Sequence, residues 1–262
     1  MKRTLLTAIL FLMIFGAALL IGPGCSHESP VDPVATGAAT VETSKPVTPT
    51  TFVETFDSHR NVGGWSFGTT HRPVIEDLGG NTGGYLHDPS VITFAPSPGT
   101  ELGEESIFTG NYRERKVTSV GIDLRCIDYE WDITTRYLTL IIMNDNGTPL
   151  DLEDDWGAYF IGDITLPSKY VAWLTSTMEN EPGWVSYDFN IPSQENPLQE
   201  DRLPEGWNFI RWWSGSGQQP GGSWVALMQN VSYIQFCYGD PTLYYVLQTF
   251  DLGLDNPRIS WQ

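Results

Sequence analysis

The chain has 262 residues, with 26 glycines, 18 prolines and a formal net charge of −18 at pH 7. So acidic a chain is repelled by nucleic acid and by anionic membrane surfaces, and both are therefore excluded as direct partners. The glycine and proline content favours a fold with many turns over a helical one.

Residues 1–24 have the features of a secretion signal. Lys2 and Arg3 precede the apolar run Leu5–Ile21, which is shorter than the roughly 20 residues of a membrane-spanning helix. Gly22-Pro-Gly24 ends the run just before Cys25. The segment resembles a bacterial lipoprotein signal, which implies that Cys25 is acylated and that the protein is held at the outer membrane or cell surface. The alternatives are a secreted or periplasmic protein and an uncleaved membrane anchor.

Residues 25–50 are expected to form the acylated start and a disordered tether. Ser26–Thr50 is rich in proline, serine, threonine, valine and alanine and has almost no bulky side chains, so it cannot bury a core. A domain anchored through lipid alone needs such a spacer to stand clear of the bilayer.

Residues 51–262 are predicted to form one all-β domain, because short alternating segments are separated by turn signals and no long segment has helical periodicity. About ten strands of this kind are typical of a two-sheet antiparallel β-sandwich, or jelly roll. Asn196–Trp207 and Leu227–Asn230 are expected to hold a helical turn at most. The expected strands are Phe52–Phe56, Tyr85–Leu86, Ser90–Phe94, Val117–Ile127, Arg136–Met143, Trp156–Ile161, Trp184–Ile191, Val231–Tyr238, Leu243–Asp251 and Arg258–Trp261.

Two motifs mark the ends of this domain. Gly63-Gly-Trp65 followed by Gly79-Gly-Asn-Thr-Gly-Gly-Tyr-Leu86 resembles the opening of laminin-B-like jelly rolls. Gly253-Leu-Asp-Asn-Pro-Arg-Ile259 resembles the closing strand of galactose-binding-like and carbohydrate-binding jelly rolls. Thr82 stands where the first motif usually has proline, and Pro257 departs from the second. The resemblance implies the fold and a tendency to bind glycans, without implying an activity.

The same resemblance implies a structural calcium ion where the first and last strands meet. Glu54, Asp57 and Asp255 carry the carboxylates that would hold it, helped by backbone carbonyls, since Ca²⁺ takes six to eight oxygens. The alternative is that these are exposed acids at strand ends. A second acidic cluster, Asp145 and residues 151–155, lacks EF-hand spacing and is interpreted as a solvated loop.

The two cysteines of the domain are predicted to point to opposite faces of their strands. Even-numbered residues from Val120 to Cys126 are apolar, which turns Cys126 inward, whereas Ile234, Phe236 and Tyr238 turn Cys237 the other way. A disulfide needs facing side chains, so none is expected.

Ligand binding is predicted beside a tryptophan pair. Trp212 and Trp213 are adjacent, so on a strand they point to opposite faces and one ring should lie outside the core. Exposed rings suit the apolar face of a sugar, and neighbouring donors suit its hydroxyls. The alternative is that the pair caps the sandwich edge. The expected hydrogen-bonding residues are Arg211, Gln218 and Gln219, and the tryptophans expected in the core are Trp65, Trp156, Trp184 and Trp224.

Catalysis has little support in the sequence, which lacks the acidic pattern of jelly-roll glycosidases and the Gly-x-Ser-x-Gly elbow. The sequence therefore predicts an envelope-anchored, non-catalytic module that binds glycans or a cell-surface polymer. Two alternatives stay open. One is a structural or adhesion module without a small ligand, and the other is a polysaccharide hydrolase or lyase.

Overall fold

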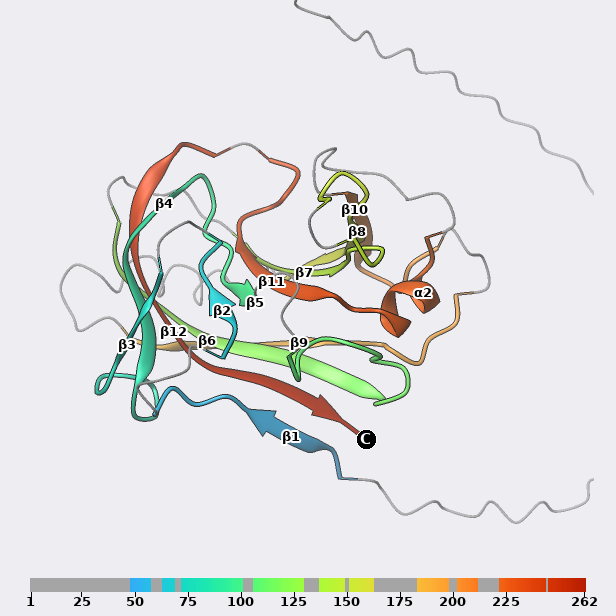
Figure 1. Ribbon diagram of the computed structural model, residues 1–262, viewed down its shortest axis with the longest axis horizontal. Helices are drawn as coiled ribbons and strands as arrows, with labels where there is room; N and C mark the ends of the chain where they lie inside the picture. Colours follow the sequence, from blue (N-terminus) through green and yellow to red (C-terminus); the bar gives the residue numbers. More distant parts are fainter. Residues whose placement is uncertain are drawn as a thin grey trace, which may run out of the picture. The chain divides into compact units, whose positions relative to one another are not determined.

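Two antiparallel sheets make up the fold, as the sequence predicts (Figure 1). The strands are β1 (Thr50–Val53), β2 (Trp65–Ser66), β3 (Val74–Glu76), β4 (Tyr85–Thr93), β5 (Gly99–Thr100), β6 (Val117–Tyr129), β7 (Leu138–Asn144), β8 (Trp156–Ile161), β9 (Val185–Asn190), β10 (Trp207–Arg211), β11 (Tyr233–Tyr238) and β12 (Gln248–Trp261). Sheet A has the order β3-β4-β12-β6-β9, with β1 also paired to β12. Sheet B has the order β10-β8-β7-β11-β5-β2.

The computed structural model describes residues 48–57, 63–68, 72–100, 106–129, 137–148, 151–162, 183–197, 202–211, 222–243 and 245–262. All of these belong to the unit Pro46–Gln262. The predicted signal and Cys25 lie outside the described residues, as does the tether except for its last three residues. No helix in the described ranges is long and apolar enough to cross a membrane.

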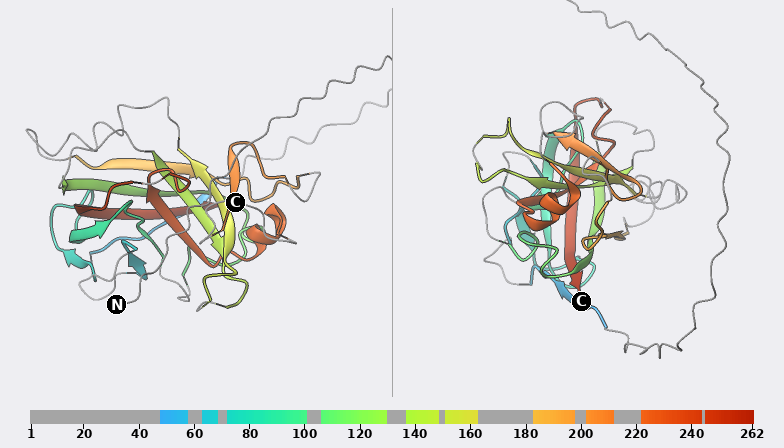
Figure 2. Two further views of the ribbon diagram at one scale, coloured as in Figure 1. Left: turned by 90° about the horizontal axis from the view of Figure 1, so that it is seen from above. Right: turned by 90° about the vertical axis from the view of Figure 1, so that its right-hand side faces the viewer.

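The main core fills the space between the two sheets because each long strand alternates. On β6, Val120, Ile122 and Leu124 are buried in this core, and on β7 Leu140 and Ile142 join them. Figure 2 shows the two layers from the side. The buried, inward-facing Cys126 confirms the orientation predicted for it.

The short strands β2, β3 and β5 are not among the expected strands, and β4, β12 and β10 differ from the expected pattern. β4 is one strand rather than two. The expected turn around Pro89 is instead an irregularity within the strand, where the pairing with β12 shifts between Phe250 and Leu252. β12 is likewise one strand, with an irregularity between Asp255 and Arg258 that accommodates Pro257. β10 begins at Trp207, the last residue of the segment that was expected to hold a helical turn. The short helix α2 (Trp224–Gln229) begins after Ser223, whose hydroxyl accepts a hydrogen bond from the Ala226 N–H.

The tryptophans divide differently from the prediction. Trp65, Trp156 and Trp224 are buried in the core as expected, and Trp207 joins them. Trp184 does not, so that prediction is wrong. Its ring lies over Gly253 and packs edge-on against Tyr85, with ring centroids 5.3 Å apart, on the outer face of sheet A.

Candidate functional site

The outer face of sheet B carries an apolar cluster of its own. Odd-numbered side chains of β7 point away from the core that Leu140 and Ile142 occupy, so this sheet is apolar on both faces. A sandwich needs only its inner faces to be apolar, and because the buried members of this second apolar layer are at most 9% exposed, the chain itself already covers them. The buried members of this outer cluster are Ile141, Met143, Tyr159, Ile210, Tyr233 and Cys237.

A buried carboxyl group lies at one end of the outer cluster. Asp155 directly precedes β8 and is 0% exposed, and its Oδ2 accepts a 2.8 Å hydrogen bond from the Tyr233 hydroxyl. Its Oδ1 is buried and has no hydrogen-bond partner among the described residues. Burial raises the pKa of Asp155, the hydrogen bond from Tyr233 opposes that rise, and Asp145 adds to it. The face thus combines apolar and aromatic side chains with one unsatisfied acceptor, a combination typical of small-ligand sites.

Arg211 is the predicted ligand-binding residue that falls within the described part of the chain. It ends β10, the edge strand of sheet B, and its register partner is Trp156, the residue after Asp155. The structure therefore places the start of the predicted tryptophan loop at the edge of sheet B, at the end marked by Asp155. The remaining predicted residues, which lie outside the described ranges, are Trp212, Trp213, Gln218 and Gln219.

Besides the aromatic pair Tyr85 and Trp184, the outer face of sheet A carries polar side chains that bond to one another across strands. His87 on β4 bridges two neighbours, with Nδ1 3.1 Å from a carboxylate oxygen of Glu76 and Nε2 2.8 Å from one of Asp251. Arg258 on β12 joins Asp123 and Asp188 in the same way. The hydrogen-bonding groups of these side chains are therefore satisfied by other residues of the protein.

The residues predicted to hold calcium surround the glycine turn, residues 79–84. Asp57 Oδ1 accepts a hydrogen bond from the Gly84 N–H at 3.2 Å. Asp255 accepts one from the Thr82 N–H at 3.1 Å. Gly83, at φ +86°, must be glycine, because a Cβ there would lie 2.2 Å from Asp57 Oδ1. Glu54 takes part in this junction through its backbone N–H, which donates to the Pro257 carbonyl at 2.8 Å.

Part of this donor set is already engaged, because one oxygen of Asp57 and both oxygens of Asp255 accept backbone N–H groups. Carboxylate oxygens that accept N–H groups face positive hydrogens, whereas a cation needs converging oxygens. Within the described ranges, no group of three or more acidic, histidine or cysteine side chains is placed to hold a metal ion. Burial raises the pKa of Asp255, and hydrogen bonds from backbone N–H groups, Thr82 first, oppose that rise. Asp57 and Asp255 therefore tie the glycine turn to the first and last strands.

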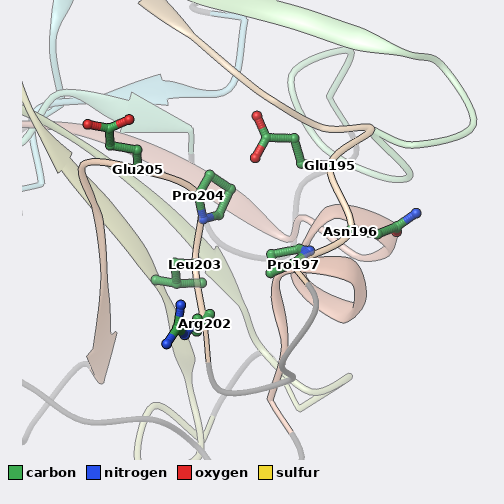
Figure 3. Close-up of a pocket in the computed structure, with 7 residues that line it drawn as sticks. All are labelled: Glu195, Asn196, Pro197, Arg202, Leu203, Pro204 and Glu205. Carbon is green, nitrogen blue, oxygen red and sulfur yellow. The ribbon is translucent and has the colours of Figure 1, made fainter. Parts of the chain in front are cut away.

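A hollow of about 440 Å³ lies between the segment after β9 and the segment before β10 (Figure 3). Arg113 holds one wall through its guanidinium, which donates to the carbonyls of Ser193 and Glu195. None of the described residues that line the hollow is aromatic. The lining residues are Glu195, Asn196, Pro197, Arg202, Leu203, Pro204 and Glu205.

Sequence reasoning missed both the outer cluster and the pair of Asp155 and Tyr233. A signal for the cluster existed, because Leu140–Met143 is a continuous apolar run and such a run indicates a strand buried on both faces. No sequence signal paired Asp155 with Tyr233, which lies 78 residues away on another strand. The cysteines do lie on opposite faces as predicted, since Cys126 is in the main core and Cys237 in the outer cluster.

The chain matches no known protein-family profile and no curated protein. Among solved structures it is similar to an exo-beta-agarase, with 13% identity and a TM-score of 0.39 over 79% of this chain, and it spans only 24% of the agarase chain. It is also similar to CtCBM11, a protein studied in solution for its dynamics and binding, with 10% identity and a TM-score of 0.32 over 84% of this chain and 92% of the other. These likenesses are distant, so the function is argued from the residues of this chain.

Proposed function

We propose that this protein is an exported, lipid-anchored and non-catalytic module that binds a polysaccharide or surface glycan through the outer face of sheet B. The observation that carries the proposal is the outer cluster itself. Apolar and aromatic side chains, each at most 9% exposed, form a second packed layer on this face, with Asp155 at its end, and Arg211 at the edge of the sheet leads directly into Trp212 and Trp213 in the sequence.

The tryptophan pair, rather than the outer cluster itself, carries the rings proposed to contact the C–H face of a pyranose. Tyr159 and Tyr233 are only 9% and 1% exposed, and the Tyr233 hydroxyl already donates to Asp155, so they support the face from within. Trp212 and Trp213 follow directly after β10 in the sequence.

Binding to a panel of neutral and anionic polysaccharides tests the proposal. Wild-type protein should bind at least one of them, and Trp212→Ala or Trp213→Ala should weaken that binding about tenfold or more, as loss of an aromatic anchor does. The matched control is Trp184→Ala, which removes a partly buried tryptophan from the outer face of sheet A and should leave affinity unchanged. Failure to bind any polysaccharide, or equal losses in the control, would overturn the proposal.

The proposed cellular location rests on Cys25 and the sequence around it. Mature bacterial lipoproteins carry at least two acyl chains, and two chains anchor a protein stably where one does not. Mass spectrometry of the mature N-terminus should find a diacylated or triacylated Cys25, and Cys25→Ser should release the protein from membranes. An unmodified N-terminus downstream of Cys25 would indicate a secreted protein instead.

An adhesion module is the second candidate, and a patch of exposed apolar side chains favours it. Ile92 and Phe94 at the end of β4, with Val246 and Leu247 before β12, are exposed, and the pairing of Thr93 with Gln248 brings the two segments together. Such patches mark protein contacts. This candidate predicts self-association that Phe94→Ser weakens and that tryptophan substitutions leave intact, as sedimentation at several concentrations would show.

A further inference from the structure

Arg258 lies at the irregularity of β12, and all five N–H donors of its guanidinium are engaged. Nε donates to Asp188 Oδ1 at 2.7 Å, and Nη2 donates to Asp188 Oδ2 and to the Tyr187 carbonyl, each at 2.9 Å. Nη1 donates to Asp123 Oδ1 at 2.8 Å and to the Asn256 carbonyl at 3.2 Å. The Arg258 side chain is only 17% exposed.

The acceptors around this guanidinium form a cage of oxygens. Two carboxylates and two backbone carbonyls, drawn from β6, β9 and β12, converge on one positive group. Carboxylate and carbonyl oxygens are the ligands that a hard divalent cation takes. Here the cation is part of the chain, and its planar fork matches Asp188 with two parallel hydrogen bonds.

The neighbouring backbone is shaped for this side chain. Gly121 on β6 is the register partner of Arg258, and a Cβ on Gly121 would lie 2.3 Å from Asp188 Oδ1 and 2.8 Å from Arg258 Nε. Any other residue at this position would displace the ion pair. Asn256, at φ +46°, has the left-handed conformation that asparagine tolerates, and its carbonyl accepts from Nη1.

The cage is joined to the glycine turn through the second oxygen of Asp123. Asp123 Oδ2 accepts hydrogen bonds from the side-chain amides of Asn81 and Asn256, each at 2.8 Å. Burial raises the pKa of Asp123, but these hydrogen bonds, one from Ser186 and the charge of Arg258 outweigh it and hold the pKa below its usual value. The same Asp123 therefore connects the turn, β12 and the arginine.

We infer that the guanidinium of Arg258 takes the place of a structural cation at the closing end of the sandwich, so that this protein needs no metal there and becomes calcium-responsive when the arginine is removed. The acceptors left behind by Arg258→Ala are Asp123 Oδ1, both oxygens of Asp188 and the carbonyls of Tyr187 and Asn256. With the guanidinium gone, this set has negative charge and several oxygens but no cation.

Thermal unfolding with added CaCl₂ or EDTA tests the inference. The melting temperature of the wild-type protein should be the same in millimolar CaCl₂ and in EDTA. Arg258→Ala should melt about 10 °C lower in EDTA, the effect of leaving a buried acid unpaired in a domain of this size, and CaCl₂ should restore part of that loss. Arg258→Ala combined with Asp123→Asn should not respond to CaCl₂.

Arg125→Ala is the matched control, because Arg125 is also a half-buried arginine on the outer face of sheet A, but among the described residues it donates to the Gly79 carbonyl and lies over the Trp184 ring instead of joining two carboxylates. It should melt close to wild type and show no calcium response. A wild-type melting temperature that rises with CaCl₂ or falls with EDTA would overturn the inference, as would Arg258→Ala without a calcium response. If Arg258→Ala does not fold in EDTA, its refolding yield with and without CaCl₂ gives the same decision.

Discussion

The outer faces of the two sheets differ in the kinds of side chains that they carry. On sheet A, charged side chains bond to one another across strands, and Arg258 and His87 each join two carboxylates. Sheet B carries a second packed layer of apolar and aromatic side chains and leaves one carboxylate oxygen of Asp155 without a partner among the described residues. The polar groups named on sheet A are satisfied within the protein, whereas sheet B keeps an unsatisfied acceptor. We expect sheet A to matter most for stability, and we propose sheet B as the side that binds.

The largest effect expected on sheet A comes from Asp123→Ala. The substitution leaves Arg258 without its buried partner and should lower the free energy of unfolding by about 3–5 kcal/mol, measured by chemical denaturation. Asp188→Ala is the control, because the Asp188 side chain is 62% exposed and an exposed pair contributes about 1 kcal/mol at most. Equal losses in the two variants would show that the buried pair is not what holds the turn.

The low pKa of Asp123 adds a pH test to that substitution. Because the folded-state pKa lies below the unfolded value, the stability that Asp123 contributes is complete above the ordinary aspartate pKa and is lost as the pH falls through the folded value. The difference between wild type and Asp123→Ala should therefore shrink in acid. A difference that does not change with pH would contradict the ion-pair account.

On sheet B, Ile141→Ala should cost about 2–4 kcal/mol although Ile141 lies on an outer face. Its side chain is buried within the outer cluster, so its truncation should resemble a core substitution. The control is Ile92→Ala, which truncates an isoleucine on the exposed end of β4 and should cost under 1 kcal/mol. Similar small losses for both would mean that the outer cluster does not behave as a packed surface.

The smallest effect is expected at Asp155. Its folded-state pKa is raised, so wild-type stability should fall as the pH rises through that value, and Asp155→Asn should remove this fall and gain about 1 kcal/mol at pH 7. Tyr233→Phe removes the hydrogen bond that opposes the rise and should make the loss at high pH steeper. Denaturant midpoints across pH 4–8 would measure both, and identical profiles for all three proteins would exclude Asp155 as a strained group.

The sequence predicted the sheets better than the sites. Strand alternation identifies β6, β7 and β8 because their inward residues repeat every second position, and it orients Cys126 and Cys237 correctly. Strand alternation wrongly divides β12 in two, because Pro257 is typical of the start of a strand. In the structure, β12 pairs with β6 on both sides of the irregularity at Pro257. Long-range pairing overrides the local signal there.

The candidate site was less accessible to sequence reasoning because it depends on distances between strands. Asp57 and Asp255 lie beside the glycine turn, where one oxygen of each accepts a backbone N–H of the turn. Arg258 was treated only as part of a closing motif. Its role becomes visible once β6 and β9 bring Asp123 and Asp188 to it, and no local pattern encodes that convergence.

Hydrogen–deuterium exchange with and without a bound polysaccharide tests the assignment of binding to sheet B most directly. The titration should use whichever member of the panel binds most tightly. Exchange should slow in β7, β8, β10 and β11 and stay unchanged in β4, β6 and β12. Protection of the strands of sheet A, with those of sheet B unaffected, would contradict the assignment.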